Sequence, residues 1–388
     1  MILLYNLFSK YADNLKLSEL LRYFKIISKN PNIINFVNGL PDPRTVPINE
    51  ITEITNQIIK EYSVRAFQYS ITCGIKELKD QILEFVKNRG IYDISENNIC
   101  ITVGSQEALY MLFSIFINPG DNIAIENPTY ISALETLRTL NPNFNGINIT
   151  PKGYEIDDLR KSNAKLLYTV PSAQNPSGYT LNINERKKII EIAHENNTII
   201  IEDDTYGFLL FDDYVPAIKA LDDEDKVIYV GSMSKVFSSG LRIGWIIANE
   251  KVIEKIEALK QNINAHSPTL NQLITAEAIR TGIIDKNIAY TKSLYKMKSN
   301  LMKNEIIKNL GDKVDFISPT GGMFFFLWTK NLDTEKLLEK AIKNNVAYLP
   351  GKYFYHDLSG YNTIRLSYSY PRENEIIEGI KRLGEIIS

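Results

Sequence analysis

From about residue 40 to residue 290 the chain alternates short apolar runs with longer segments of helical periodicity. Such alternation predicts a mostly parallel sheet that helices cover on both faces. The apolar runs have the length of strands, and none is long enough to span a bilayer. The expected strands are Ile99–Val103, Ile123–Ile125, Leu166–Val170, Thr198–Ile201, Val227–Val230 and Ile243–Ala248.

The two ends of the chain follow a different pattern. An amphipathic stretch at Ser18–Ser28 precedes Gly-Leu-Pro-Asp-Pro, a run that ends regular structure. Near the other end, the pattern predicts a charged helix over Ser293–Asn309, a strand in T-I-R-L-S-Y-S-Y and a final helix over Asn374–Ile387. Because 388 residues exceed what one hydrophobic core usually supports, we expect two domains in this α/β chain. They are a large domain at 40–290 and a smaller α+β domain formed by 1–39 and 291–388.

Composition and charge exclude several classes of protein. The 44 basic and 46 acidic residues are spread along the chain, so nothing favours binding to nucleic acid or to a membrane. The two cysteines, Cys73 and Cys100, are far apart and form no C-x-x-C motif, which suggests neither a metal site nor a disulfide framework. The apolar amino terminus lacks a basic leader and a cleavage site, so we expect no signal peptide. A protein of the reducing cytoplasm fits these features.

Polar residues follow five of the expected strands at their carboxyl ends. In an open α/β sheet, ligands bind beyond these strand ends, so five such groups together predict one site. The groups are Gly104-Ser105-Gln106, Asn127-Pro128-Thr129-Tyr130, Gln174-Asn175-Pro176, Asp203 through Tyr206, and Ser232 through Lys235.

One of these groups places a single lysine in a loop that is rich in serine and glycine. The segment Val227–Ala248 reads V-I-Y-V-G-S-M-S-K-V-F-S-S-G-L-R-I-G-W-I-I-A, with Arg242 seven residues after Lys235 and no carboxylate nearby. This composition indicates an anion site that contains an amine, although a solvated loop would explain the segment taken alone. The segment resembles the S-x-S-K-x-x-x-x-G-L-R-x-G-[WY] signature of fold-type I pyridoxal-phosphate (PLP) aminotransferases of class I and II. The resemblance implies a large domain with a mostly parallel sheet of the seven-stranded type, and in that family the lysine binds the cofactor covalently.

The resemblance extends over nearly the whole chain and implies a site for the cofactor phosphate. Ser105 opens a helix, where free backbone amides and the helix dipole suit a phosphate, although an ordinary helix cap would also explain it. The family usually adds a tyrosine from the partner subunit, which implies a homodimer with a shared site. The residues implied are Ser105, the Gln106 amide, Ser232, Ser234, Arg242 and, from the partner, the residue at the position of Tyr69.

The resemblance also implies contacts to the cofactor ring. Asp203 follows an apolar strand, where burial would raise its pKa unless a cation faced it, and the protonated pyridine nitrogen would be that cation. Tyr206 would donate to the phenolic oxygen, and only the spacing to Tyr206 favours Asp203 over Asp204. Tyr130 would stack on the ring, and Asn175 would contact the phenolic oxygen. Turn, cap and core roles are the simpler alternatives for these residues.

Substrate contacts come from further along the chain. Arg365 lies in an apolar strand, where a charge is costly unless it is paired, and a substrate carboxylate would supply the partner. By resemblance, Arg365 binds the α-carboxylate with help from Asn175 and the backbone of Gly39. The amino-terminal segment resembles the 2-aminoadipate and kynurenine branch of the family, in which it covers the substrate. Arg22 in that segment would meet a distal carboxylate, or it would simply face solvent.

These implications predict an aminotransferase that moves the amino group of an amino acid to a 2-oxo acid, with 2-oxoglutarate as the usual acceptor. Lys235, freed from the cofactor, would move the proton of the substrate α-carbon. The expected specificity is of the 2-aminoadipate type with broad tolerance; an aromatic amino acid or aspartate aminotransferase is the alternative. A PLP-dependent lyase could share every cofactor contact. A regulator built on this fold is less expected, because only about forty residues precede the Gly-Leu-Pro segment.

Overall fold

A computed structural model describes residues 7–27, 30–212 and 214–387, without the side chains of residues 10, 20, 22, 24 and 26. Its largest element is an eight-stranded sheet with the strand order β2-β9-β8-β7-β6-β3-β4-β5. The pairs from β8 to β4 are parallel, whereas β9 runs antiparallel to both of its neighbours. The strands are β2 (Ile99–Thr102), β3 (Asn122–Asn127), β4 (Asn143–Thr150), β5 (Gly153–Tyr154), β6 (Leu166–Thr169), β7 (Ile199–Asp203), β8 (Val227–Ser232) and β9 (Gly244–Ile247).

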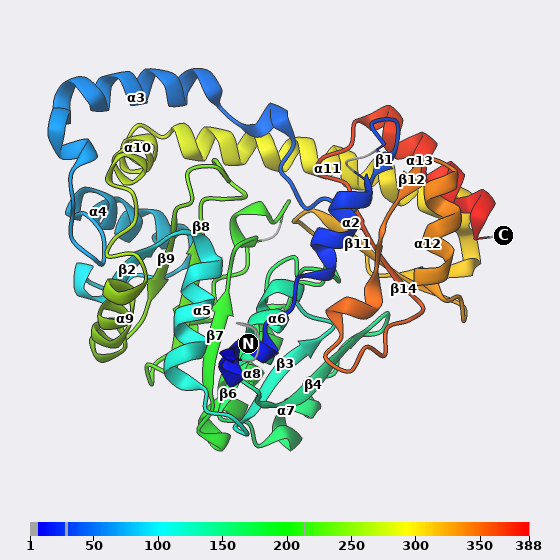
Figure 1. Cartoon of the computed structure of the whole chain (residues 1–388), viewed down its shortest axis with the longest axis horizontal. Coiled ribbons are helices and arrows are strands. Elements are labelled where there is room, and N and C mark those ends of the chain that lie inside the picture. Colours follow the sequence, from blue (N-terminus) through cyan, green and yellow to red (C-terminus); the bar gives the residue numbers. More distant parts are fainter. Residues whose placement is uncertain (1–6, 28–29, 213, 388) are drawn as a thin grey trace.

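Both faces of the central strands are buried, as their continuous apolar runs predict. Successive residues of one strand enter different clusters: Leu166 and Tyr168 pack into the larger core, and Leu167 packs into the smaller core under α7 and α8. Helices cover the two faces (Figure 1). The helices associated with this sheet are α3 (Ile48–Tyr62), α4 (Lys76–Phe85), α5 (Gly104–Phe116), α6 (Ile131–Thr139), α7 (Asp157–Ser162), α8 (Ile183–Asn196), α9 (Glu250–Ile263) and α10 (Thr269–Arg280).

A second, antiparallel sheet lies at the other side of the molecule, on the right in Figure 1. Its strand order is β10-β11-β14-β13, and a two-stranded pair, β1 with β12, lies beside it. The long helix α11 runs from the large sheet towards the small one (Figure 1). The elements are α1 (Lys10–Asn14), α2 (Glu19–Ile27), β1 (Ile34–Asn35), α11 (Ile283–Leu310), β10 (Val314–Phe316), β11 (Phe324–Thr329), α12 (Thr334–Lys343), β12 (Val346–Ala347), β13 (Leu349–Pro350), β14 (Thr363–Ser367) and α13 (Glu373–Ile386).

The α/β class with a mostly parallel main sheet is confirmed, and each of the six expected strands lies in that sheet. The sheet has eight strands rather than seven, because the two-residue strand β5 pairs with the edge of β4. The sequence did not reveal β4, because its residues N-F-N-G-I-N-I-T mix asparagine and glycine with few apolar side chains. The helix expected at Ser293–Asn309 is longer, since it begins at Ile283. The division into 40–290 and 1–39 plus 291–388 stays a prediction. Within the described residues, no helix combines the length and the hydropathy that crossing a bilayer requires.

Candidate active site

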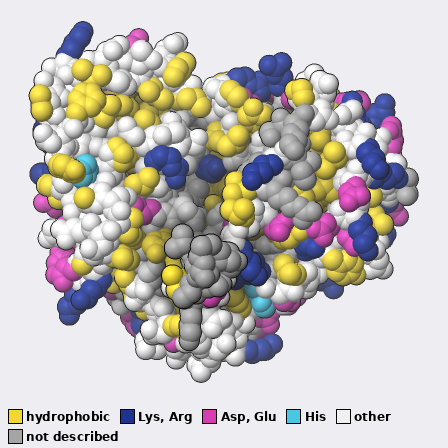
Figure 2. Space-filling view, viewed as in Figure 1, with side chains coloured by type: hydrophobic (Ala, Val, Ile, Leu, Met, Phe, Trp, Pro, Cys, Tyr) yellow, Lys and Arg dark blue, Asp and Glu magenta, His cyan; other side chains and the backbone are white. Residues whose placement is uncertain are grey.

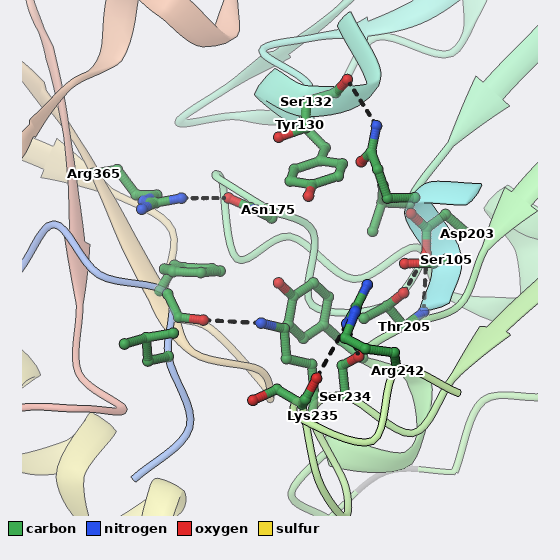
Figure 3. A pocket seen from close by; sticks show the side chains of 17 residues that line it. Ser105, Tyr130, Ser132, Asn175, Asp203, Thr205, Ser234, Lys235, Arg242 and Arg365 are labelled. Carbon is green, nitrogen blue, oxygen red and sulfur yellow. Dashed lines mark hydrogen bonds between the residues drawn. The ribbon is translucent and has the colours of Figure 1, made fainter. Parts of the chain in front are cut away.

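A cavity of about 250 Å³ lies where the carboxyl ends of the large-sheet strands meet β11, β14 and the Gly39 segment. On the side of the molecule seen in Figure 1, the surface is hollowed between the two halves (Figure 2). Residues from both sheets and from the intervening loops form the wall (Figure 3). They are Gly39, Leu40, Ser105, Gln106, Tyr130, Ser132, Val170, Asn175, Asp203, Thr205, Tyr206, Ser234, Lys235, Ser239, Arg242, Phe324 and Arg365.

Lys235 projects into this cavity from the loop after β8. Its Nζ donates to the carbonyl oxygen of Gly39 at 2.9 Å and contacts no carboxylate among the described residues. Burial lowers the pKa of this amine to about 8, and the nearby cations Arg365 and Arg242 add to the effect. About a tenth of an amine with such a pKa is unprotonated at pH 7, far more than of an ordinary lysine, so Lys235 can act as a nucleophile or as a base.

The end of the cavity next to α5 gathers groups that bind anions. Arg242 donates to Ser234 Oγ at 3.3 Å and to two backbone carbonyls, so its charge faces only neutral oxygens. Its guanidinium lies against Gly104, where a Cβ would come within 2.4 Å of Nη2. Gly104 begins α5, and Ser105 follows it at the cavity wall. Free helix amides, a hydroxyl and a guanidinium therefore meet at one place, as a phosphate site requires.

Two consecutive aspartates at the end of β7 face opposite sides of the sheet. Asp203 lines the cavity, and its carboxylate accepts hydrogen bonds from Tyr168 at 3.1 Å and from the Thr205 hydroxyl at 2.5 Å. Burial raises the pKa of Asp203, and these hydrogen bonds oppose the rise. Asp204 instead pairs with buried Arg89 at 2.6 Å, away from the cavity. Alternation along the strand thus gives the cavity one carboxylate and leaves the other in the core.

At the opposite end of the cavity, Arg365 on β14 is a buried cation that forms no ion pair among the described residues. It is 3% exposed and donates to Asn175 Oδ1 at 3.1 Å and to the Val37 carbonyl at 2.5 Å. Its Nε has no hydrogen-bond partner, and the guanidinium lies 4.3 Å from the centre of the Phe324 ring. Burial lowers the pKa of Arg365 to about 10. A buried cation with a free donor is suited to bind a carboxylate.

The family model for aminotransferases of class I and II matches residues 32–383. The chain belongs to this family. The aromatic-amino-acid aminotransferase 1 of Thermococcus litoralis is 37% identical over 98% of this chain and 94% of that protein. The 2-aminoadipate transaminase of Thermus thermophilus is 31% identical over 98% and 96% of the two chains. Among solved structures, a Pyrococcus horikoshii kynurenine aminotransferase in complex with PMP superposes with a TM-score of 0.94, at 35% identity over 99% and 97% of the two chains.

The protein is therefore a PLP-dependent aminotransferase, and its cavity can be tested for fit to that cofactor. The aldehyde needs an amine, which Lys235 supplies. The phosphate needs donors, which α5, Ser234 and Arg242 supply. The pyridine nitrogen needs a carboxylate, and Asp203 offers one whose charge has no cationic partner among the described residues. The residues present fit the group.

Most of the residues that the sequence indicated line this aminotransferase cavity. Ser232 does not: it is buried, and its hydroxyl accepts from the Ser234 amide at 3.2 Å. Tyr69 is 86% exposed on the single chain, outside the cavity. Arg22 lies in α2, but its side chain is outside the described residues. The Gln106 side chain turns towards Ser132 and Thr136, while its backbone lies in the first turn of α5.

Some residues of the wall were not assigned from the sequence. The Thr205 hydroxyl donates to the Asp203 carboxylate. Thr205 lies between Asp203 and Tyr206 in the sequence, and only those two residues were given a role. Phe324 begins β11, and its ring lies under the guanidinium of Arg365. Ser239 lies in the lysine loop, where a hydroxyl-rich composition gave the only signal. Leu40 and Ser132 carry no signal that chemistry alone would reveal.

Proposed function

We propose that this aminotransferase accepts amino acids of the 2-aminoadipate type with broad tolerance and passes the amino group to a 2-oxo acid, 2-oxoglutarate first. The observation that carries the proposal is Arg365, a buried guanidinium at the cavity wall without a carboxylate partner among the described residues. A charge left this way is costly unless a ligand pairs with it. Every amino acid and every 2-oxo acid brings the carboxylate that would do so.

In this proposal the residues divide the work along the cavity (Figure 3). Arg365 and Asn175 bind the substrate carboxylate and thereby orient the α-carbon, with Gly39 beside them. Lys235 Nζ would take the proton from the α-carbon and pass it on to the carbon that receives the amino group, and in the second half-reaction it would move a proton in the opposite direction. PLP, when bound, supplies an electrophilic aldehyde and a ring that takes up the electron pair left at the α-carbon.

The remaining polar residues hold the cofactor in the same proposal. Asp203 keeps a proton on the pyridine nitrogen, because its carboxylate has no other cationic partner among the described residues. Tyr206 donates to the phenolic oxygen, and Tyr130 packs on the ring. The phosphate is held by the residues Ser105, Gln106 through its amide, Ser232, Ser234 and Arg242. Ser232 acts indirectly, since its hydroxyl bonds the backbone amide of Ser234.

Aromatic amino acids are the second candidate donors, and a feature of the cavity favours them. Tyr130, Tyr206 and Phe324 form an aromatic wall, and Leu40 adds an apolar side chain. The three cations of the wall, Lys235, Arg242 and Arg365, are all committed in the proposed mechanism. A distal carboxylate would therefore need Arg22 as its partner. The relative from Thermococcus litoralis, named for aromatic amino acids, supports this second candidate.

We further propose a cytoplasmic homodimer with a shared active site. Apolar side chains next to the large sheet are exposed on the single chain, which is costly unless a second copy covers them. They include Ile48, Val64, Phe67, Tyr69 and Ile71, all more than 60% exposed, and Figure 2 shows hydrophobic side chains gathered over this part of the molecule. Tyr69 would reach the phosphate site of the other subunit. We also propose that the chain divides into a large domain at 40–290 and a smaller domain formed by 1–39 and 291–388.

A panel of amino donors with 2-oxoglutarate tests this function. We expect glutamate formation with 2-aminoadipate and, at lower kcat/KM, with phenylalanine and tyrosine. Release of ammonia without an oxo acid would instead identify a lyase. Replacing Arg22 with Ala should raise KM for 2-aminoadipate far more than KM for phenylalanine. Equal changes would remove the proposed role of Arg22 and leave the aromatic donors as the better candidates.

A further inference from the structure

Glu126 is a buried carboxylate one hydrogen-bonded step behind the cavity wall. It lies in β3, is 1% exposed and does not itself line the cavity. Its Oε1 accepts from Thr169 Oγ1 at 2.6 Å and from the Val170 amide at 3.0 Å, and its Oε2 accepts from Gln174 Nε2 at 2.8 Å. Among the described residues no cation pairs with it. Neither the sequence nor the mechanism above gives this charge a role.

The side chain of Gln174 cannot be turned over in this network. Its Nε2 also donates to the Pro128 carbonyl at 2.8 Å, and its Oε1 accepts from the Ser177 amide at 2.7 Å. A carbonyl can only accept and a backbone amide can only donate. A reversed carboxamide would therefore place its oxygen against the Pro128 carbonyl and its nitrogen against the Ser177 amide, and neither pair could form a hydrogen bond. The group that faces Glu126 is therefore the amide nitrogen, and Glu126 Oε2 must accept.

The other oxygen of Glu126 is constrained in the same way, because the Val170 amide can only donate. An ionised carboxylate accepts at both oxygens, whereas a carboxamide does so at one. Burial raises the pKa of Glu126 to about 7, and the hydrogen bonds from Thr169, Gln174 and Val170 oppose the rise. The hydrogen-bond polarity thus requires an acceptor at both oxygens of this side chain, which glutamate supplies and glutamine does not, at a place where burial makes the charged form costly.

The network ends on a substrate-binding group. Gln174 starts a tight turn, since its carbonyl accepts from the Gly178 amide at 2.7 Å and its amide donates to the Tyr179 carbonyl at 2.8 Å. Asn175 lies in this turn, and its Oδ1 accepts from Arg365. We propose that Glu126 is a positioning residue for substrate binding: through Gln174 it holds the Asn175 turn, and thereby Arg365, in place for the α-carboxylate. The inference rests on the carboxylate-binding role proposed above for Asn175 and Arg365.

A double-mutant cycle on the PLP-loaded protein tests this chain of contacts. The probe is hexanedioate, which is 2-aminoadipate without the amine, and calorimetry gives its Kd. We expect Glu126→Gln to raise this Kd about 10-fold, the worth of one misplaced charged hydrogen bond, while the absorbance of the bound cofactor stays unchanged. In an Asn175→Ala background the same substitution should change Kd less than about 2-fold, because contacts that act through one another are not additive.

Glu202→Gln is the matched control. Glu202 is equally buried, on β7, which β6 separates from β3, and accepts from the amides of Ile218 at 2.7 Å and Lys219 at 2.8 Å, away from the cavity. The Glu202→Gln variant should bind hexanedioate with the wild-type Kd. Equal effects of Glu126→Gln and Glu202→Gln, or a full 10-fold effect of Glu126→Gln in the Asn175→Ala background, would overturn the proposal.

Two further variants keep the outcomes distinguishable. If Glu126→Gln does not fold, as thermal unfolding would reveal, Gln174→Ala in the same two backgrounds replaces it with the same expectation. Arg365→Ala reports on the proposed function alone. Unchanged hexanedioate binding in that variant would show that Arg365 does not bind the carboxylate. Lost binding in Arg365→Ala together with unchanged binding in Glu126→Gln would reject only the positioning role.

Discussion

The two faces of the central sheet both bury charged side chains, but they treat them differently. On the face covered by α8, Arg89 pairs with Asp204 at 2.6 Å and Arg186 lies 3.7 Å from Glu202. Ser172 and Tyr229 supply further hydrogen bonds to Asp204. On the cavity face, at the carboxyl ends of the strands and against β14, the cations meet only neutral oxygens among the described residues. Buried charges that pair with each other are part of the core, whereas unpaired charges at a cavity wall are suited to bind a ligand of the opposite charge.

Two consecutive residues, Asp203 and Asp204, show the same difference. Their backbones are continuous and both carboxylates are buried, yet only Asp204 has a cation beside it. The same residue type therefore serves stability in one position and cofactor binding, in our proposal, in the next. Substitutions on the two faces should accordingly change different quantities.

The largest expected effect is on the paired face. Arg89→Met leaves Asp204 buried without its closest cation, which should lower the free energy of unfolding by about 3–5 kcal/mol. Urea unfolding measures this loss. Arg160→Met, which breaks the exposed pair with Glu195, should cost less than about 1 kcal/mol. Similar losses for the two variants would contradict a stabilising role for the buried pair.

The next effect is on the cavity face. Arg365→Met removes a cation that has no internal carboxylate to leave unpaired among the described residues, so folding should be kept. We expect kcat/KM for amino acids to fall about 100-fold, since a buried charged contact to substrate is lost. Arg138→Met is the control, because Arg138 donates to the carbonyl oxygens of Tyr355 and His356 outside the cavity. A fall of equal size in the Arg138→Met control would contradict the assignment of Arg365 to substrate binding.

The smallest effect concerns the pH at which the protein takes up PLP. Only an unprotonated amine attacks an aldehyde, so the uptake rate of the cofactor-free protein should rise with pH and level off above about 8, the lowered pKa of Lys235. In Arg365→Met the midpoint should move to higher pH, because one of the cations that lower this pKa is gone. Cofactor absorbance follows the uptake. A midpoint near the ordinary lysine value of 10.5 would contradict a buried Lys235.

The sequence was most informative where a local rule applies. Polar residues after parallel strands meet at one sheet edge, which is why Ser105, Asp203 and Lys235 can be grouped from their places in the chain alone. Strand alternation also separates Asp203 from Asp204, although on the sequence only the spacing to Tyr206 favoured Asp203. Arg365 stood out as a charge within an apolar strand, and the family resemblance then gave it the α-carboxylate as its partner.

The sequence was silent where contacts join distant segments without a local pattern. Nothing near Glu126 or Gln174 signals that they bond across 48 residues. The sulfur atoms of Cys73 and Cys100 lie 2.7 Å apart in the core, yet their spacing suggested no contact. Lys235 meets the Gly39 carbonyl across 196 residues, and only the folded chain determines that pair. Such contacts depend on tertiary packing, which hydrophobic periodicity does not encode.

One measurement tests most directly whether the Lys235 amine of the cavity binds the cofactor. The PLP-loaded protein is reduced with borohydride, digested and mapped by mass spectrometry. We expect the phosphopyridoxyl group on Lys235, with the adduct absent from a Lys235→Ala variant that still folds. An adduct on another lysine, or no adduct in protein that transfers amino groups, would contradict this expectation.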